Sequence, residues 1–393
     1  MKRIFILLLA LVVFVCGCSE RKSAVGETEP EKKETRAGIW ISFSEINSML
    51  NSEKGFEAEF SAMLDNCEEI GTDDVYVHIR SYCDSLFKSE YFPLIEEAGK
   101  YDFDIFEYIV NEIHNRGMAV HAWINPYRVL TSSEDIEKLS QESPAYKWLK
   151  DETAENDKNV CFANGIYLNP AESEVRNLVI NGIREVIDKY EVDGIHFDDY
   201  FYPTIDPAFD SASYEKYCSL AELPLSLEKW RRANVNALIS GCYTAIKFMD
   251  KDIVFSVSPM ASVEKNYSEL YADVAVWIEN GCVDVIIPQI YFGFEYPDSE
   301  FRFENLLSIW KKLSKSNSEV ELMIGLAPYK IGTDTAADTA EWCGSDDIIA
   351  RQAKMCIEDG NISGYVLFSA TGIFSEEDLN TRQTENLVEV IED

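Results

Sequence analysis

The sequence contains few basic residues relative to its acidic ones. It has 35 Lys and Arg against 70 Asp and Glu, which gives a formal net charge of -35 over 393 residues. A surface this anionic repels nucleic acid and anionic lipid headgroups, so we expect neither as a direct partner. The same charge argues against a strongly acidic polymer as substrate, unless the binding cleft is locally basic.

Two classes of cofactor motif are also missing. No Cys-x-x-Cys pair occurs among the eight cysteines beyond residue 18, which argues against a zinc or redox motif. No strand-like run is followed by a Gly-rich dinucleotide turn. We therefore expect no cofactor and no resident metal. Several cysteines lie within apolar helix or strand patterns, where a buried free thiol is commoner than a disulfide.

The N-terminus has an apolar run that is too short for a comfortable membrane span. The run covers residues 4–15, whereas a membrane-spanning helix needs about 20 residues. Lys2 and Arg3 precede it, as in a signal peptide. The following VCGC, residues 15–18, resembles a bacterial lipobox and predicts cleavage before Cys18 and lipidation of that cysteine. The alternative is an ordinary cleaved secretory signal; both predict export, and the lipobox predicts attachment to the cell membrane.

Residues 19–36 are polar and charged and contain almost no large apolar side chains. Such a segment cannot bury enough surface to fold, so it predicts a disordered tether. Residues 37–393 show neither an internal repeat nor a second domain with its own pattern. We expect them to form one domain.

That domain contains eight short β-like runs, each followed by a stretch with helical periodicity. The runs are residues 38–43, 75–80, 119–125, 194–200, 254–259, 283–291, 322–329 and 364–370. The alternation predicts an α/β fold of the (β/α)8 TIM barrel type, with a doubly wound open sheet as the alternative. Long connections follow the third strand (126–172) and the fourth (201–225). Both belong at the C-terminal end of the barrel, where barrel enzymes keep their active sites.

Several strands carry polar residues on one face. In residues 194–200, His196, Asp198 and Tyr200 alternate with Ile195 and Phe197, and the apolar pair must pack under the helices. The polar face then lines the barrel interior and its upper rim. Sorting the other strands in the same way extends the expected ring to Arg80, His121, Trp123, Asn125, Gln289 and Tyr291. Aromatic walls with a carboxylate and amides suit a sugar ligand.

Eight blocks of sequence carry a family resemblance. They are GIWISFSE, VYVHIRSYCDSLFKSEYFP, RGMAVHAWINPYR, YLNPAESEVR, DGIHFDDYFYP, WRRANVN, VDVIIPQIYF and IGLAPYKIG. In this order they resemble the glycosyl hydrolase-like 10 family, a bacterial set of exported and often lipidated barrels. The resemblance runs from Gly38 to Gly332 and implies glycoside hydrolysis of a cell-wall or other extracellular polysaccharide, for some members peptide-free peptidoglycan. It adds Arg128 to the expected sugar contacts. The segment Tyr82-Cys83-Asp84 departs from the more usual Pro-Tyr-Gly-Asp of the family. Because Asp84 is retained, we expect this departure to affect only the shape of the loop.

Glycoside hydrolysis usually requires two carboxyl groups. Asp198, at the end of the fourth strand, is the first candidate. The second must come from a loop, and the candidates are Asp199, Asp84, Glu264 and Glu295. We favour Asp199 for catalysis and place Asp84 among the binding residues, although Asp199 points away from the interior unless the strand has already turned.

Two other functions stay open at this point. His78, His121 and His196 could join Asp198 in a metal-dependent hydrolase, although His78 is expected one layer below His121. The chain could also be a lipid-anchored barrel that binds glycans without cleaving them.

Overall fold

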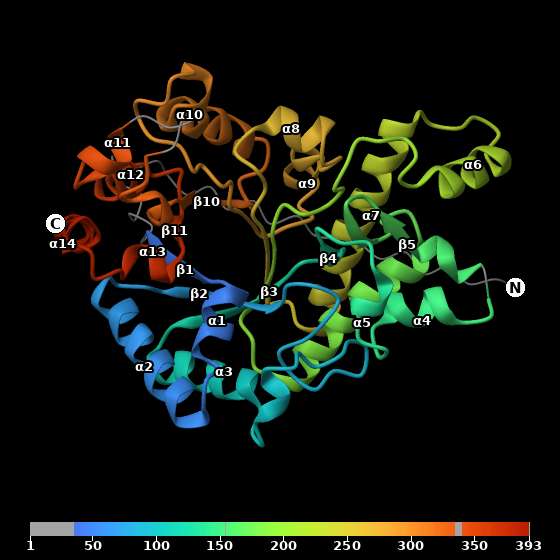
Figure 1. Cartoon of the computed structure of the whole chain (residues 1–393). Helices are drawn as coiled ribbons and strands as arrows, with labels where there is room; N and C mark the ends of the chain where they lie inside the picture. The colour runs from blue at the N-terminus through green and yellow to red at the C-terminus, as the bar shows by residue number, and fades with distance from the viewer. Residues whose placement is uncertain (1–34, 154, 335–339, 393) are drawn as a thin grey trace, which may run out of the picture. The chain divides into compact units, whose positions relative to one another are not determined.

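The computed structural model describes residues 35–153, 155–334 and 340–392, and within them eight parallel strands close a barrel (Figure 1). The strands are β1 (Arg36–Ile41), β2 (Asp74–Arg80), β3 (Ala119–Ile124), β7 (Gly194–Phe197), β8 (Val254–Val257), β9 (Val285–Ile286), β10 (Glu321–Leu326) and β11 (Gly364–Phe368). Their order around the barrel follows the chain, and β11 pairs with β1 to close it. The predicted (β/α)8 TIM barrel is confirmed.

Helices surround the barrel strands (Figure 1). The longer ones are α2 (Glu53–Glu69), α3 (Ile105–Asn115), α5 (Ser173–Lys189), α7 (Leu227–Met249), α10 (Phe303–Ser314), α12 (Ile348–Ile357) and α14 (Asp378–Glu392). Shorter ones are α1 (Phe43–Met49), α8 (Val263–Ser268), α9 (Val274–Glu279), α11 (Glu341–Gly344) and α13 (Ala370–Ile373). The helical segment between two consecutive barrel strands returns the chain to the end of the barrel where the next parallel strand begins.

Helix α3 illustrates how the sequence specifies these elements. Asp104 caps its N-terminus by accepting hydrogen bonds from the backbone N–H groups of Phe106 and Glu107. The buried residues of the helix recur at a spacing of three or four and therefore form one stripe facing the barrel. They are Ile105, Phe106, Ile109, Val110 and Ile113.

The two long connections contain secondary structure of their own. After β3 the chain forms a three-stranded antiparallel sheet of β4 (Arg128–Thr131), β6 (Gly165–Leu168) and β5 (Val160–Phe162), together with α4 (Pro144–Lys150). After β7 it forms α6 (Ser211–Leu220) before α7. Both connections start at the C-terminal end of a barrel strand, so they build outward from the end predicted to hold the site.

The barrel interior is filled by side chains, several of them aromatic. An inner cluster separate from the core under the helices consists of Trp40, Tyr76, Trp123, Val285, Ile287, Met323 and Val366. Because the interior is packed, a ligand can be received only where the packing stops, at one end of the barrel.

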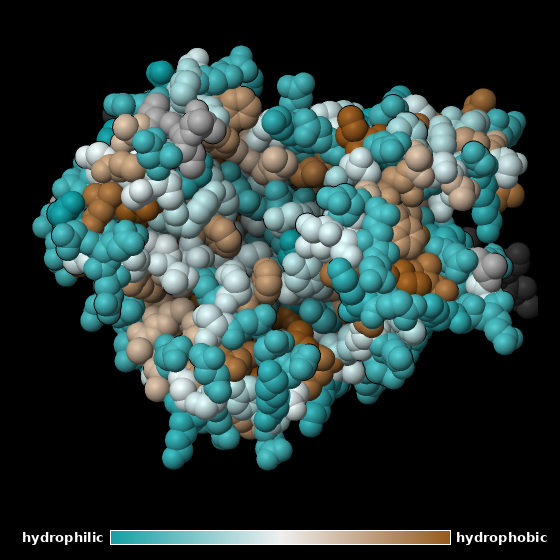
Figure 2. All heavy atoms as spheres, viewed as in Figure 1, coloured by the Kyte–Doolittle hydropathy of each residue, from teal (hydrophilic) through white to brown (hydrophobic). Residues whose placement is uncertain are grey.

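The surface seen in Figure 2 is largely hydrophilic, and its hydrophobic residues form small separate patches. Among the described residues no helix combines the length and apolarity needed to cross a membrane. All eight cysteines in this part of the chain are free. The predicted signal peptide, Cys18 and residues 19–34 of the predicted tether lie outside the described residues, and Arg36 is already part of β1.

Candidate active site

A cavity of about 430 Å³ opens at the C-terminal ends of the barrel strands. Its volume lies in the range of small-molecule binding sites. The lining residues come from most of the barrel strands and the loops that follow them. They are Trp40, Ser42, Phe43, Ser44, His78, Trp123, Arg128, Asp198, Asp199, Tyr200, Ser258, Gln289, Tyr291, Tyr329 and Phe368.

Asp198 lies at the floor of this cavity and is only 2% exposed. Its carboxylate accepts hydrogen bonds from Trp123 Nε1 at 3.1 Å and from Asn125 Nδ2 at 3.1 and 3.3 Å. Burial raises the pKa of Asp198, while the Arg128 charge and the donors from Trp123 and Asn125 oppose that rise. Asn125 is in turn fixed because its Oδ1 accepts the Arg128 backbone N–H at 2.9 Å. The carboxylate is thus held in a single orientation.

Asp199 lines the same cavity because β7 ends at Phe197 and the backbone has turned by residue 199. Its side chain is partly exposed and forms a hydrogen bond with Gln289. Burial and the neighbouring Asp198 charge together raise the pKa of Asp199 to about 7. Asp199 therefore remains substantially protonated at neutral pH, whereas Asp198 has several donors that favour its charged form. Two adjacent carboxyl groups with such different surroundings suit acid–base chemistry.

One wall of the cavity is aromatic. Tyr291 stacks on Phe368 with ring centroids 5.8 Å apart, and Tyr329 meets both rings edge-on. Trp40 and Trp123 contact Phe368 with T-shaped geometry from the barrel side. These flat apolar faces can pack against the C–H faces of a sugar ring while the carboxylates and Gln289 meet its hydroxyls.

Arg128 lies at the opposite side of the cavity, beside Tyr200. Its guanidinium is 4.5 Å from the Tyr200 ring centroid and 4.7 Å from that of Tyr82, so it is held between two rings. Arg128 Nε also donates to the Ser81 carbonyl at 2.9 Å. Tyr200 is 52% exposed and can move against a ligand, whereas Arg128 is buried.

His196 lies below the cavity and supports it. Trp40 Nε1 donates to His196 Nε2 at 3.1 Å, so Nε2 is the unprotonated nitrogen and Nδ1 donates to Ser256 Oγ at 2.8 Å. Burial lowers the pKa of His196 well below its usual value, which keeps the ring neutral. His196 does not line the cavity, so its predicted sugar contact is corrected to a role in positioning Trp40.

Arg80 was expected to line the upper interior, and the structure places it outside the barrel wall. The pairing of β2 with β3 shifts register between His78 and Arg80, which breaks the alternation of faces. Arg80 then packs beneath α5, with its guanidinium carbon 4.2 Å from the Phe92 ring centroid. A Cβ atom on Gly182 of α5 would lie only 2.4 Å from Arg80 Nη1, so any larger residue here would force the Arg80 side chain to shift.

His121 faces the interior as expected but at the opposite end of the barrel. Its Nε2 lies 3.2 Å from Asp74 Oδ1, and Asp74 also pairs with Arg36 at 3.1 Å. The ring stacks on Tyr76 at 4.4 Å and passes so close to Gly194 that a Cβ there would meet Nδ1 at 2.1 Å. This trio of Arg36, Asp74 and His121, the basal ion cluster, lies apart from the cavity, so the predicted sugar contact of His121 is also corrected.

The three inward histidines do not converge. The register pairs Tyr76 with His121 and His78 with Trp123, so His78 lies one layer above His121, opposite to the expected order. At the upper layer the Trp123 ring stands beside His78 at 3.8 Å and contacts His196 at 6.1 Å. In the described part of the chain no group of three His, Cys, Asp or Glu side chains is arranged to hold a metal ion.

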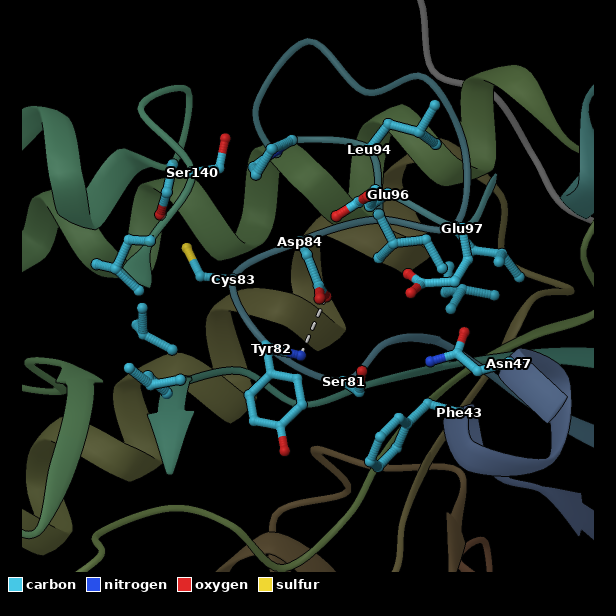
Figure 3. Close-up of a pocket in the computed structure, with 18 of the residues that line it drawn as sticks. Phe43, Asn47, Ser81, Tyr82, Cys83, Asp84, Leu94, Glu96, Glu97 and Ser140 are labelled. Carbon is cyan, nitrogen blue, oxygen red and sulfur yellow. Dashed lines mark hydrogen bonds between the residues drawn. The ribbon is translucent and has the colours of Figure 1, made fainter. Parts of the chain in front are cut away.

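Among the other candidates for the second carboxylate, Asp84 lines a neighbouring cavity (Figure 3). Its Oδ1 accepts the Tyr82 backbone N–H at 3.1 Å, and burial raises its pKa to about 6. Glu264 and Glu295 are exposed and line neither cavity. The cavity at Asp198 thus contains Asp199 as the second carboxyl group.

Sequence reasoning missed several lining residues. Trp40 and Phe368 lie on β1 and β11, and the same alternation of faces that identified Asp198 places both inward. Phe43 and Tyr329 lie in the segments that follow β1 and β10. The sequence signal that could have indicated them was their position just after the end of a barrel strand. Ser258, just after β8, was also missed.

The model of the family described as "Glycosyl hydrolase-like 10" matches residues 35–343. The chain belongs to this family. It is 32% identical over 330 residues to "Glycosyl hydrolase YngK" of Bacillus subtilis (strain 168), an alignment that covers 77% of this chain and 62% of that protein. It is 27% identical to "Glycosyl hydrolase DigH" of Escherichia coli (strain K12), with 98% of this chain and 95% of that protein covered.

Solved structures of other proteins agree on the architecture. The glycoside hydrolase domain of PgaB (BpsB) from Bordetella bronchiseptica superposes with a TM-score of 0.61 at 12% identity, over 89% of this chain and 98% of that one. The catalytic domain of a Paenibacillus polymyxa β-amylase gives 0.57 at 9% identity, over 91% and 98%. At these identities the likeness supports the barrel fold alone.

Proposed function

We propose that the protein is a glycoside hydrolase whose two carboxyl groups are Asp198 and Asp199. The observation that supports this most strongly is the pairing of these groups in one aromatic-walled cavity. Membership of a glycosyl hydrolase-like family supports the same reaction class.

In the proposed reaction Asp199 is the general acid. Its pKa of about 7 leaves about half of the molecules protonated in neutral solution, and in these it can give its proton to the glycosidic oxygen as the bond to the anomeric carbon breaks. Asp198 carries the negative charge that stabilises positive charge developing on the sugar ring. A water molecule then adds to the anomeric carbon and gives a proton to the Asp199 carboxylate, which restores the acid. Trp123 and Asn125 hold Asp198 in place, so it needs no reorientation during the step.

The proposed substrate is a bacterial cell-wall or other extracellular polysaccharide, with peptide-free peptidoglycan strands the first to test. The lipobox-like residues 15–18 support a location outside the cytoplasm, with Cys18 lipidated and the barrel attached to the cell membrane. Under this proposal the membrane is reached only through the lipid, because the acidic chain repels anionic headgroups.

The reaction is tested by substituting Asp198. Asp198→Asn keeps the size of the side chain and removes the charge, so the fold should survive. We expect kcat to fall by about 10²–10⁴-fold on peptide-free peptidoglycan strands, with KM changed much less, because the charge acts mainly in the transition state. Asp188→Asn, an exposed substitution on α5, is the matched control and should behave as the wild type.

Turnover by Asp198→Asn at the wild-type rate would contradict the assignment of Asp198. A wild-type protein that binds a panel of glycans and cleaves none of them would instead identify a glycan-binding barrel. Circular dichroism of each variant checks that the fold is retained.

A further inference from the structure

A second cavity has a volume of about 630 Å³ (Figure 3). The two cavities share two lining residues, Phe43 and His78, so they adjoin each other. The second cavity lies between α1, the loop that follows β2 and the insertion that follows β3. Its polar lining includes Asn47, Ser81, Asp84, Glu96, Glu97 and Ser140.

His78 stands at the junction with unused hydrogen-bonding capacity. It is 4% exposed and stacks on Trp123 with ring centroids 3.8 Å apart and planes 7° apart. The Arg80 backbone interacts with the ring, but among the described residues neither ring nitrogen has a partner at hydrogen-bond geometry. Burial and the nearby Arg128 charge hold the pKa of His78 well below its usual value, so the ring is neutral. It therefore presents one donor and one acceptor, and a buried group of this kind requires partners.

The rings around His78 form a ridge between the cavities. Phe43 meets His78 edge-on at 5.6 Å and Tyr82 edge-on at 5.7 Å. Arg128 connects the two sides because its guanidinium lies over Tyr82, which lines the second cavity, and over Tyr200, which lines the first. A chain molecule that crosses this ridge would pass aromatic faces throughout.

The second cavity is acidic. It is lined by three carboxyl side chains, Asp84, Glu96 and Glu97, and by one cation, Lys138. Asp84 is partly buried, and above a pH of about 6 it is mostly charged. This charge disfavours a ligand that carries a carboxylate and favours a neutral or amino-substituted one.

We propose that the second cavity is an additional sugar-binding subsite of the same cleft, which takes a sugar unit without a carboxylate. Both His78 nitrogens are buried in this structure, so the saccharide that crosses the ridge must displace the rings around His78 before the ring donates to one hydroxyl and accepts from another. The inference rests on the proposed glycoside hydrolase function, and it implies that the enzyme prefers chains long enough to fill both cavities.

The test is calorimetric binding in the Asp199→Asn background, in which turnover of the probes should be strongly reduced. The neutral probes are N-acetylglucosamine oligomers of one to five units, the cationic probes are glucosamine oligomers, and the anionic probes are oligogalacturonides of equal length. We expect affinity for neutral or cationic oligomers to rise about tenfold or more once they reach the second cavity. Oligogalacturonides should show no such rise.

Two variants localise the effect. The Asn47 side chain projects toward the second cavity from α1 (Figure 3), so Asn47→Trp should fill it and remove the gain with chain length. The shortest probes should bind Asn47→Trp with unchanged affinity. Asn51→Trp is the matched control, because Asn51 is exposed and lines neither cavity. His78→Phe retains an aromatic ring against Trp123 and removes both nitrogens, so it should weaken the longer probes by about tenfold.

Three outcomes would each contradict the subsite. They are an affinity in Asp199→Asn that does not depend on oligomer length, an unaltered rise in affinity with length when Asn47→Trp is added, and no binding of any probe. These outcomes are separate from the proposed function, which is judged by hydrolysis in the wild type. If the wild type hydrolyses glycan strands and Asn47→Trp still shows the full rise in affinity with oligomer length, the proposed hydrolase function is supported and the proposed subsite is wrong.

Discussion

Asp198 and Asp199 are neighbours in the sequence, yet different groups surround them. Asp198 is buried against Trp123 and Asn125, whereas Asp199 is partly exposed and meets Gln289. The pattern of alternating faces predicted Asp198 in the interior. It could not place Asp199, because that depends on where β7 ends, and no residue between Phe197 and Tyr200 marks the turn.

The raised pKa of Asp199 leads to a prediction about pH. The proposed acid works only in its protonated form, and that form is lost as the pH rises through about 7. We therefore expect kcat/KM of the wild type to fall about tenfold per pH unit above 7. Asp199→Asn should lose most of its activity, and its remaining kcat/KM should no longer fall as the pH rises above 7 (the alkaline limb of the profile). Initial rates between pH 5 and 9 check this, and an alkaline limb that persists in Asp199→Asn would assign it to another group.

The separated histidines lead to a prediction about metals. Because His78, His121 and His196 meet different partners, a reaction run by Asp198 and Asp199 needs no bound metal ion. Dialysis against EDTA should leave at least about 80% of the activity, a margin that corresponds to a negligible change in activation free energy. Loss of activity that is restored by a divalent cation would favour the metal-dependent alternative.

At the scale of elements, the strands were predictable and their irregularities were not. Each of the eight β-like runs overlaps one barrel strand, although several strands end earlier than predicted, since each run is a short apolar or alternating segment bounded by turn residues. Arg80 shows the limit, because the register shift in β2 arises from pairing with β3 and leaves no local mark in the sequence. The same limit applies to His121, whose inward face was predicted but whose height in the barrel depends on strand register.

The approach of β7 to His121 leads to a prediction about stability. Gly194→Ala would place a Cβ 2.1 Å from His121 Nδ1, and that ring is held by Asp74 and Tyr76. We expect the free energy of unfolding to fall by about 1–3 kcal/mol in urea titrations. Gly360→Ala, where a Cβ meets nothing within 4 Å, is the control and should change little. Full stability of Gly194→Ala would show that the His121 ring can move aside.

At the scale of the whole molecule, the barrel and its family could be predicted from the chain because eight sequence blocks follow one another in a fixed order. The extent of the site could not. The two adjoining cavities together draw on loops after β1, β2, β3 and β10 that are distant in sequence, and only closure of the barrel brings them together. Phe43 and Tyr329 were missed for this reason.

The proposed lipid anchor is a property of the whole chain. Cys18→Ala removes the only residue of the lipobox-like segment expected to carry lipid, so the mature protein should leave the membrane fraction and lose labelling by a fatty-acid probe. Asp198→Asn is a suitable control, since it should remain labelled. Lipid labelling of Cys18→Ala equal to that of the wild type would contradict the anchor.

The basal ion cluster and the residues that line the Asp198 cavity occupy opposite ends of the barrel. Arg36, Asp74 and His121 tie neighbouring strands together at one end, while the loops at the other end carry Asp198, Asp199 and the aromatic wall. Mutations that retune specificity can therefore accumulate in the loops without disturbing the ties at the base. For protein engineering, this makes the chain a scaffold on which loops from related barrels could be exchanged one at a time, while the three residues of the basal ion cluster are kept unchanged.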